Sequence, residues 1–135
     1  MDYKIEYFEK YNDKRGQLVV FLRNRDLENN QKALGQIYFV TFDKKNSIRG
    51  NHYHKKWREW FGVVSGRLKA VIMDIKTKEK KEFILDGSDT DKYIRLEIGP
   101  NIAHAFKNIS NKASLLNYSD KEWSANDTFR IEIMK

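Results

Sequence analysis

All three histidines of this chain stand where they could act together. His52 and His54 are separated by one residue, so on an extended strand both imidazoles project to the same side. Glu59 follows them closely, and His104 comes just after a turn at residues 99–101. Imidazole and carboxyl groups serve as general acids, general bases and metal ligands. The spacing therefore predicts one pocket built around these four side chains.

Two kinds of chemistry suit this pocket. A neutral imidazole from His52 or His54 can act as a general base near neutral pH, and this requires no cofactor. Alternatively, His52, His54, Glu59 and His104 can hold a divalent metal ion such as Zn, Mn, Fe or Ni. The same residues serve both chemistries, so the ligand set leaves both open.

Short strands separated by turn signals dominate the rest of the chain. Tyr93–Ile98, for example, alternates apolar and polar residues with the period of two that a half-buried strand requires. No window shows a helical stripe, so the pattern predicts an all-β sandwich or barrel. The predicted strands are Gln36–Phe42, Trp60–Ser65, Leu68–Asp74, Lys81–Leu85, Tyr93–Ile98, Ala113–Tyr118 and Thr128–Met134.

Composition limits the classes of protein to consider. With 135 residues, 40% of them apolar, the chain can bury one core, and we expect a single domain over residues 1–135. The absence of cysteine excludes disulfides and thiolate metal sites. The start resembles no signal peptide and no stretch has membrane-spanning length, so we expect a cytoplasmic protein that does not interact with membranes.

The net charge points to an anionic partner. The formal charge is +7, yet the basic residues lie mostly as scattered pairs among acidic ones. Nucleic-acid binders gather such residues on one face, and the chain has no helix-turn-helix, RNP-like or zinc-finger pattern. We therefore expect no nucleic-acid partner, and charge alone does not choose among the other anionic partners, such as a phosphate-bearing metabolite.

The histidine motifs resemble those of the cupin superfamily. His52-x-His54-x4-Glu59-x6-Gly66 is similar to the first cupin motif, and His104-x3-Asn108 after its turn is similar to the second. This resemblance implies an all-β cupin fold, a double-stranded β-helix or jelly-roll barrel, over residues 1–135.

Within that superfamily, residues 12–135 resemble the sugar-nucleotide isomerases and epimerases of bacterial surface polysaccharide synthesis. The residues that carry this resemblance are Asp13-Lys14-Arg15-Gly16, Tyr38, Arg49-Gly50, His52-Tyr53-His54-Lys55-Lys56, Gly99-Pro100-Asn101-Ile102-Ala103-His104, Ser119-Asp120, Asp127 and Arg130. The segment that runs from His52 to Lys56 is most similar to the H-x-H-K-K of dTDP-4-keto-6-deoxyhexose 3,4-ketoisomerases.

The resemblance implies an isomerase that removes a proton next to the ketone of a nucleotide-linked 4-keto-6-deoxysugar. His52 or His54 would be the base, and a partner imidazole or the hydroxyl of Tyr38 would return the proton. Arg15 and Arg49 would hold the diphosphate of a dTDP- or UDP-linked substrate, because a guanidinium matches phosphate geometry. The implied substrate-binding residues are Arg15, Arg49, Lys55, Glu59, His104 and Tyr118.

Two related activities compete with the 3,4-ketoisomerase. Residues 49–54 and 63–66 also resemble the zinc-carrying cupin domain of capsular UDP-sugar C3-epimerases. Ala103-His104-Ala105-Phe106 is similar to dTDP-4-dehydrorhamnose 3,5-epimerases, whose catalytic histidine pairs with an aspartate in a C-terminal extension. We therefore favour the ketoisomerase, then a C3- or 3,5-epimerase, with a metal-binding small cupin of other or non-catalytic function as the alternative.

The resemblance also implies a homodimer. Members of the family commonly form dimers with an exchanged N-terminal strand. Such an exchange would bring Arg15 of one subunit to the pocket of its neighbour.

Overall fold

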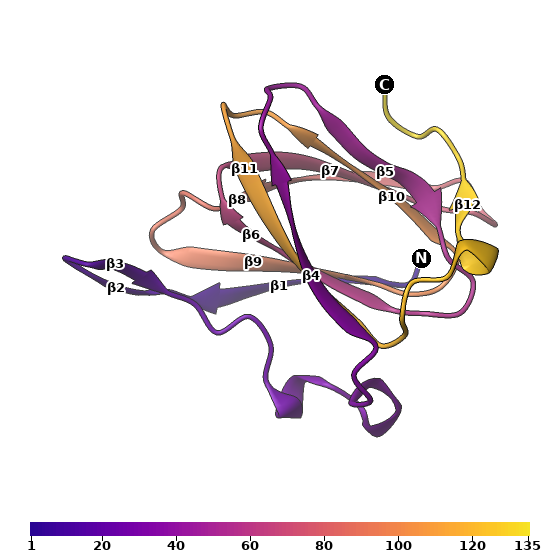
Figure 1. Ribbon diagram of the computed structural model, residues 1–135, viewed down its shortest axis with the longest axis horizontal. Helices are drawn as coiled ribbons and strands as arrows, with labels where there is room; N and C mark the ends of the chain where they lie inside the picture. Colours follow the sequence, from indigo (N-terminus) through magenta and orange to yellow (C-terminus); the bar gives the residue numbers. More distant parts are fainter.

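The computed structural model describes residues 1–135, which fold into two facing antiparallel sheets and a projecting hairpin (Figure 1). The first sheet has the spatial order β1 (Tyr3–Glu9), β9 (Lys92–Ile98), β6 (Glu59–Ser65), β11 (Ala113–Ser119), β4 (Gln36–Phe42). The second has the order β12 (Phe129–Arg130), β5 (Ile48–Tyr53), β10 (Ile102–Asn108), β7 (Arg67–Asp74), β8 (Lys80–Asp86). The hairpin consists of β2 (Tyr11–Asp13) and β3 (Gly16–Leu18). The helical segments are three short 3-10 turns, η1 (Asn24–Asp26), η2 (Asn29–Gln31) and η3 (Ala125–Asp127).

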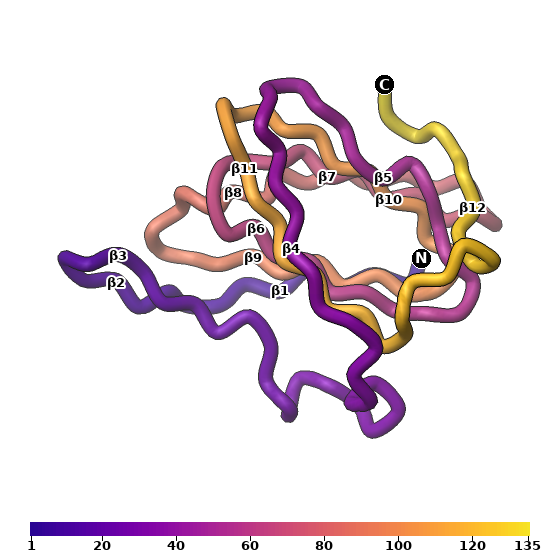
Figure 2. Tube along the Cα trace, in the orientation of Figure 1, coloured from indigo at the N-terminus to yellow at the C-terminus, as the bar shows by residue number.

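From β4 onward the chain crosses between the two sheets at almost every step, as the trace in Figure 2 shows. Only β7 and β8 are consecutive strands of one sheet in this part of the chain. Such alternation winds two antiparallel sheets into a double-stranded β-helix. The predicted all-β cupin fold is therefore confirmed.

The main core fills the space between the sheets. It contains 14 buried apolar residues, among them Ile94, Leu96 and Ile98 on one face of β9, as the alternation predicts. The opposite face of β9 is not exposed to solvent. Arg95 is 2% exposed there, because Phe21 and Asp26 from the segment between β3 and β4 lie over it. The prediction of a half-buried strand was therefore wrong for this face of β9.

The predicted strands agree with the structure to within a residue at each end, except at the C-terminus. The strand predicted over Thr128–Met134 was wrong, because only Phe129–Arg130 pairs as β12. The residues that follow leave the ladder and pack Ile133 and Met134 on the outer face of the second sheet. There the side chain of Asn51, rather than a neighbouring strand, binds their backbone.

Three N-terminal strands were not predicted. In β1, Tyr3 and Ile5 pack against the core while Lys4 and Glu9 are exposed, so a weak alternation is present in hindsight. The hairpin strands β2 and β3 have three residues each and are entirely exposed. Exposed strands this short bury no apolar face, and hydrophobic periodicity therefore has nothing to detect.

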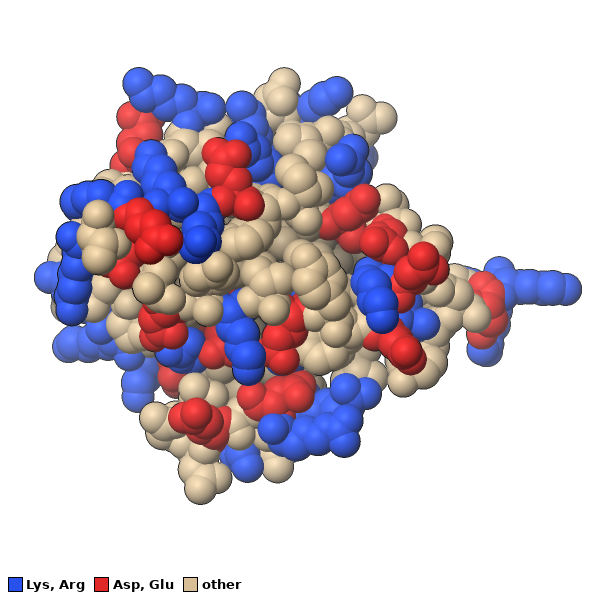
Figure 3. Space-filling model, turned by 180° about the vertical axis from the view of Figure 1, so that it is seen from behind, with Lys and Arg blue, Asp and Glu red and all other residues tan.

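Charged side chains of both signs are interspersed over the face shown in Figure 3. Lys69 lies near Glu82 and Arg67 near Asp86, with nitrogen–oxygen distances of 3.2 and 3.6 Å. No helix of the structure is long and apolar enough to span a membrane.

Candidate active site

A β-bulge at the end of β5 precedes the first histidine. On β10, His104 lies opposite His52 but Ala105 lies opposite Gly50, so Asn51 has no partner on that strand. Gly50 has a φ of 101° and Asn51 a φ of 57°. A Cβ atom at Gly50 would lie 2.6 Å from the carbonyl oxygen of His104, so only glycine fits there. Bulges redirect the side chains that follow them, and His52 here faces the barrel interior.

The two neighbouring histidines share one side, as their spacing predicts. The ring centroids of His52 and His54 are 5.1 Å apart. Tyr53 points the other way and stacks on Phe129. His54 Nδ1 is 2.7 Å from the carbonyl oxygen of Asp127, and a carbonyl only accepts hydrogen bonds. In the neutral ring Nδ1 therefore carries the proton, and Nε2 offers its lone pair to the interior.

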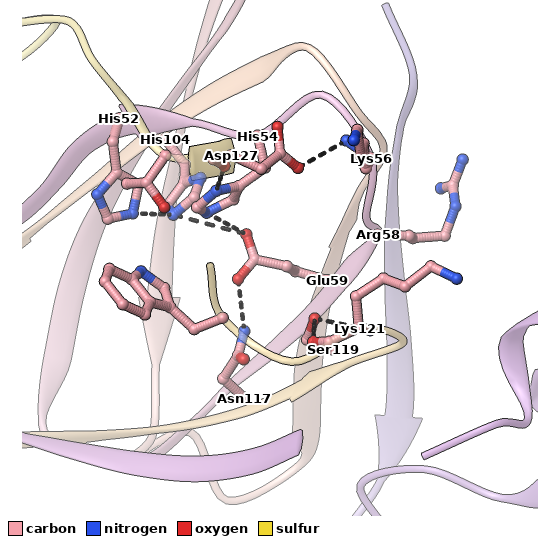
Figure 4. Close-up of polar contacts among 12 residues, drawn as sticks. His52, His54, Lys56, Arg58, Glu59, His104, Asn117, Ser119, Lys121 and Asp127 are labelled. Atoms are coloured by element: carbon pink, nitrogen blue, oxygen red, sulfur yellow. Dashed lines mark hydrogen bonds and ion pairs between the residues drawn. The ribbon is translucent and has the colours of Figure 1, made fainter. Parts of the chain in front are cut away.

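The side chains of three histidines and Glu59 converge in the interior of the barrel (Figure 4). His52 Nε2 and His104 Nε2 are 3.1 Å apart, so one of these nitrogens donates a hydrogen bond to the other. Glu59 Oε2 lies 3.7 Å from His104 Nε2 and 3.8 Å from His54 Nε2. The amide of Asn117 donates a long hydrogen bond of 3.5 Å to Glu59 Oε1. The structure thus brings His52, His54, Glu59 and His104 into one cluster.

Burial determines the charge of this cluster. It lowers the pKa of His52 to about 4, with further lowering by nearby His54 and Arg130. Burial also lowers the pKa of His104 well below its ordinary value, and that of His54 less strongly because the Asp127 carbonyl opposes the shift. The pKa of Glu59 rises to about 8, chiefly because the carboxyl is buried. Burial therefore favours the uncharged form of all four groups.

A cavity of about 170 Å³ opens beside the cluster. Its polar wall consists of Tyr38, Arg49, His52 and His104. Burial and the proximity of Glu59 raise the pKa of Tyr38, so its hydroxyl stays protonated. The apolar floor is formed by Val40, Phe42, Phe61, Phe106 and Leu115. This cavity therefore combines two imidazoles, the Tyr38 hydroxyl and the Arg49 guanidinium with a surface suited to apolar groups.

Three predicted substrate-binding residues lie away from this cavity in the single chain. Arg15 is at the turn of the β2–β3 hairpin, where its side chain is 91% exposed and pairs with Asp13. Lys55 lies on the outside, with its ammonium 4.3 Å from the centroid of the Phe129 ring. Tyr118 projects from the outer face of β11, because alternation turns its neighbour Asn117 inward, and its hydroxyl donates to the carbonyl of Gln31.

The structure adds residues that sequence reasoning did not select for the site. Asn117 lies on the inner face of β11 next to Glu59, and a polar residue in phase with buried Leu115 was an available signal. Trp57 stacks on His54 with ring centroids 3.8 Å apart. Asp127 belongs to the family motif, but its role could not be predicted, because its contacts reach residues more than 70 positions away.

The cluster also fits a divalent metal ion. One donor atom from each of His52, His54 and His104 can be chosen so that all lie within 4.8 Å of one another. Neutral imidazoles are the form that binds metal, and Glu59 would supply a carboxylate once ionised. The arrangement can therefore support either acid–base chemistry or metal binding.

Known proteins share both the sequence pattern and the fold. A curated relative, the TDP-4-oxo-6-deoxy-alpha-D-glucose-3,4-oxoisomerase of Aneurinibacillus thermoaerophilus, is 24% identical over 130 residues, covering 96% of this chain and 87% of the relative. The structure of a 3,4-ketoisomerase from Helicobacter canadensis is 29% identical in sequence and has a TM-score of 0.77. The match covers 96% of this chain and 91% of the ketoisomerase chain.

A second similar structure contains a bound sugar nucleotide. It is a variant of the 3,4-ketoisomerase QdtA from Thermoanaerobacterium thermosaccharolyticum in complex with TDP-4-keto-6-deoxyglucose. This structure has a TM-score of 0.78 and 22% sequence identity, and the match covers 96% of this chain and 87% of the QdtA chain. The family model described as "FdtA: WxcM-like, C-terminal" matches residues 1–132. This chain therefore belongs to the FdtA family of WxcM-like C-terminal domains.

Proposed function

We propose that this protein is a sugar-nucleotide 3,4-ketoisomerase acting on a dTDP-linked 4-keto-6-deoxyhexose. The observation that supports this most directly is the neutral His52–His104 pair beside Tyr38 and Arg49 in one cavity. Two of the similar proteins described above are 3,4-ketoisomerases and a third is a 3,4-oxoisomerase of a TDP-sugar. The apolar cavity floor suits the methyl group of a 6-deoxysugar.

The reaction is a proton transfer without net oxidation. His52 removes the proton from C3, next to the C4 ketone, and the electron pair forms an enediolate across C3 and C4. Protonation at C4 and loss of the proton from the C3 oxygen then leave the ketone at C3. His104 accepts or donates across its 3.1 Å contact with His52, and the Tyr38 hydroxyl donates to the developing oxyanion.

Substrate binding makes His52 a stronger base than it is in the free protein. A pKa of about 4 keeps the imidazole unprotonated but weakly basic. A diphosphate bound at Arg49 brings negative charge to the cavity that His52 also lines, and this charge opposes the effect of Arg130, which lowers the pKa of His52. Negative charge nearby favours the imidazolium and so raises the pKa of His52 toward neutrality, where general-base catalysis is efficient.

The direct test is conversion of substrate followed by NMR. Incubation with dTDP-4-keto-6-deoxyglucose should produce the 3-keto isomer, and the same sugar linked to UDP tests the choice of nucleotide. Retention of the 4-ketone with inversion at C3 would instead identify a C3-epimerase. No change in any nucleotide-linked ketosugar would contradict an isomerase of either kind.

The convergence of three imidazoles and Glu59 keeps a metal-binding cupin as the second candidate function. Elemental analysis of protein purified without an affinity tag decides whether metal is bound. A stoichiometric metal in a protein that turns over no ketosugar would favour this candidate. Full turnover after chelator treatment would favour metal-free chemistry.

We also propose a homodimer that exchanges N-terminal strands. In the single chain β1 pairs with β9 along its whole length, and the hairpin that follows projects from the body (Figure 1). Exchange would place a partner's β1 in this position and carry Arg15 to the neighbouring subunit. The outward side chains of Ile37 and Phe39 on edge strand β4 are 62% and 75% exposed and offer apolar surface to a partner. A monomeric mass by light scattering would contradict the dimer.

The cytoplasmic location belongs to the same proposal. A sugar-nucleotide isomerase requires access to nucleotide-linked substrate. Fractionation of the source cells with an antibody to this protein tests the location, and recovery outside the cytoplasmic fraction would contradict it.

A further inference from the structure

The C-terminal segment lies against all three histidine-bearing sites from outside the barrel. β12 pairs with β5, placing Phe129 opposite Tyr53 and Arg130 opposite His52. The amide of Ile131 donates to the carbonyl of Asn51 at 2.9 Å. The chain from Asp127 to Met134 therefore runs alongside the bulge that aims His52.

Asn51 is the main anchor of this segment. As the bulged residue it has no partner on β10, so its polar groups are free for other contacts. Its Oδ1 accepts hydrogen bonds from the amides of Ile133 and Met134 at 2.9 and 3.0 Å. Its Nδ2 donates to the carbonyl of Met134 at 3.0 Å. Three hydrogen bonds from one side chain thus fix the segment to the bulge.

Asp127 holds the second histidine in the same way. Its two carboxylate oxygens accept the amides of Lys55 and Lys56 at 2.9 and 3.0 Å, and its carbonyl accepts Nδ1–H of His54 at 2.7 Å. Asp127 is only 6% exposed, which strengthens these bonds relative to bonds in water. Together they fix the turn after His54 and the tautomer of its ring.

The third histidine is supported by packing. Ile133 and Met134 are each 9% exposed and lie in one apolar cluster with Ala103 and Ala105. These alanines flank His104 on β10 and project to the opposite face of the strand, where larger side chains would displace the segment. The same eight residues thus support His52 and His54 by hydrogen bonds and His104 by van der Waals contact.

We propose that residues 127–134 form a clamp that positions the histidines of the active site, with Asn51 and Asp127 as its positioning residues. This inference rests on the proposed function for its catalytic consequence. The clamp holds Nε2 of His54 unprotonated toward Glu59 and keeps His52 at the cavity wall. Neither Asn51 nor Asp127 touches the cavity, so substrate affinity does not depend on them directly.

The test compares Asn51→Gly and Asp127→Asn with a matched control. Glycine retains the left-handed backbone of residue 51 and removes only the three side-chain bonds. Ser110→Ala serves as control, because it also removes a hydrogen-bonding side chain, which accepts from the amide of Arg67 and donates to Asn108 or Lys112 in the loop between β10 and β11. We expect kcat to fall about 10- to 100-fold in both clamp variants with KM within about twofold, as for loss of supporting bonds around reacting groups. The control should retain kcat.

Nitrogen NMR of the imidazoles separates failure of the clamp from failure of the proposed function, because it needs no substrate. With chelator present, ¹⁵N-labelled parent protein should show His54 as the Nδ1–H tautomer alone, and both clamp variants should show a mixture. Asn51→Asp keeps the two bonds to Ile133 and Met134 and should restore most of the parent spectrum and kcat. Folded variants with the parent's tautomer and kcat would overturn the clamp, whether or not the parent isomerises a sugar. If Asn51→Gly does not fold, Asn51→Asp and Asp127→Asn decide the question by the same spectra.

Discussion

The histidine cluster has a β10 wall, which carries His104, and a β5 wall, which carries His52 and precedes His54, and the two walls are built in different ways. His104 lies in the middle of β10, which pairs along its whole length with β7 and on its other side with β5. His52 and His54 lie where β5 bulges and ends, and their outer neighbour is the two-residue strand β12. One wall is thus a regular interior ladder, whereas the other depends on contacts with a distant part of the chain.

Substitutions on the β10 wall should therefore mainly change the stability of the fold, whereas substitutions on the β5 wall should mainly change the positions of the histidines. A side chain on β10 such as Phe106 packs in the main core, so changing it should affect the whole fold. The end of β5 is held mainly by hydrogen bonds and by half-buried rings such as Phe129. Changes there should displace catalytic groups at small cost in stability.

The largest expected effect is loss of turnover in His52→Asn. Removing a general base typically costs 10²- to 10⁴-fold in rate, so kcat should fall by roughly that factor. Circular dichroism and the urea midpoint should stay near the parent's values, because His52 lies outside the main core. The same substitution at His104 should impair turnover and also reduce stability, since that side chain is 2% exposed. A parental rate in His52→Asn would remove this residue from the mechanism.

Truncation of one aromatic ring on each wall measures the contrast in stability. Phe106→Ala should lower the free energy of unfolding by about 3–5 kcal/mol, because Phe106 is 3% exposed and leaves a cavity. Phe129→Ala should cost less than about 2 kcal/mol, since its ring is only partly buried against Tyr53. Urea denaturation of both variants gives the two values. Equal losses would mean that the walls do not differ as described.

Nucleotide binding should depend on arginines from two different places. Arg49 lines the cavity, so Arg49→Ala should weaken dTDP binding by about 10- to 100-fold through loss of a charge-assisted hydrogen bond of roughly 1.5–3 kcal/mol. Arg15→Ala should do the same only if the partner subunit's hairpin reaches the cavity. Calorimetric titration with dTDP and UDP measures both. Unchanged affinity in Arg49→Ala would contradict diphosphate binding at this wall.

The pH dependence of stability should show the buried groups of both walls. The folded pKa of Glu59 is raised to about 8, so above pH 4.5 the unfolded state releases a proton that the folded state keeps, and stability falls as pH rises until about 8. The three histidines have lowered folded pKa values, so stability falls as pH drops below 6.5. Between pH 4.5 and 6.5 the effect of the three histidines outweighs that of Glu59. The stability of the fold should therefore be greatest near pH 6.5.

Comparison of the thermal unfolding of the parent with that of Glu59→Gln between pH 6.5 and 8 isolates the Glu59 contribution, because the three histidines contribute equally to both. Relative to the variant, the parent should lose at most about 2 kcal/mol over this range, since one proton corresponds to roughly 1.4 kcal/mol per pH unit. Glu59→Gln keeps the shape of the side chain and should show no such fall. A slope that persists in the variant would assign it to another group.

Sequence reasoning succeeded where local pattern determines structure. The alternation of β9 and the one-residue spacing of His52 and His54 each follow from the geometry of a strand. His104 was placed by the turn at residues 99–101, and Asn101 indeed adopts a φ of 64°. The convergence of the three histidines was therefore predictable, although β10, which carries His104, was not among the predicted strands.

The contacts that hold the β5 wall were not predictable, because the residues that form them are far apart in the sequence. Asp127 contacts Lys55 over 72 positions, and Asn51 contacts Met134 over 83. No short stretch of sequence contains both partners of these contacts. The pattern of Thr128–Met134 is therefore typical of a strand, although the side chain of Asn51 binds the backbone of Ile133 and Met134. Arg15 shows a related limit, because its proposed role depends on a second subunit.

The measurement that tests the central claim most directly is hydrogen exchange during turnover. The protein, treated with chelator, is incubated in D₂O with dTDP-4-keto-6-deoxyglucose and followed by proton NMR beside His52→Asn. The account predicts that the parent exchanges the C3 hydrogen and forms 3-keto product with deuterium at C4, and that His52→Asn does neither at a comparable rate. Absence of both exchange and product in the parent, or equal exchange in the variant, would contradict it.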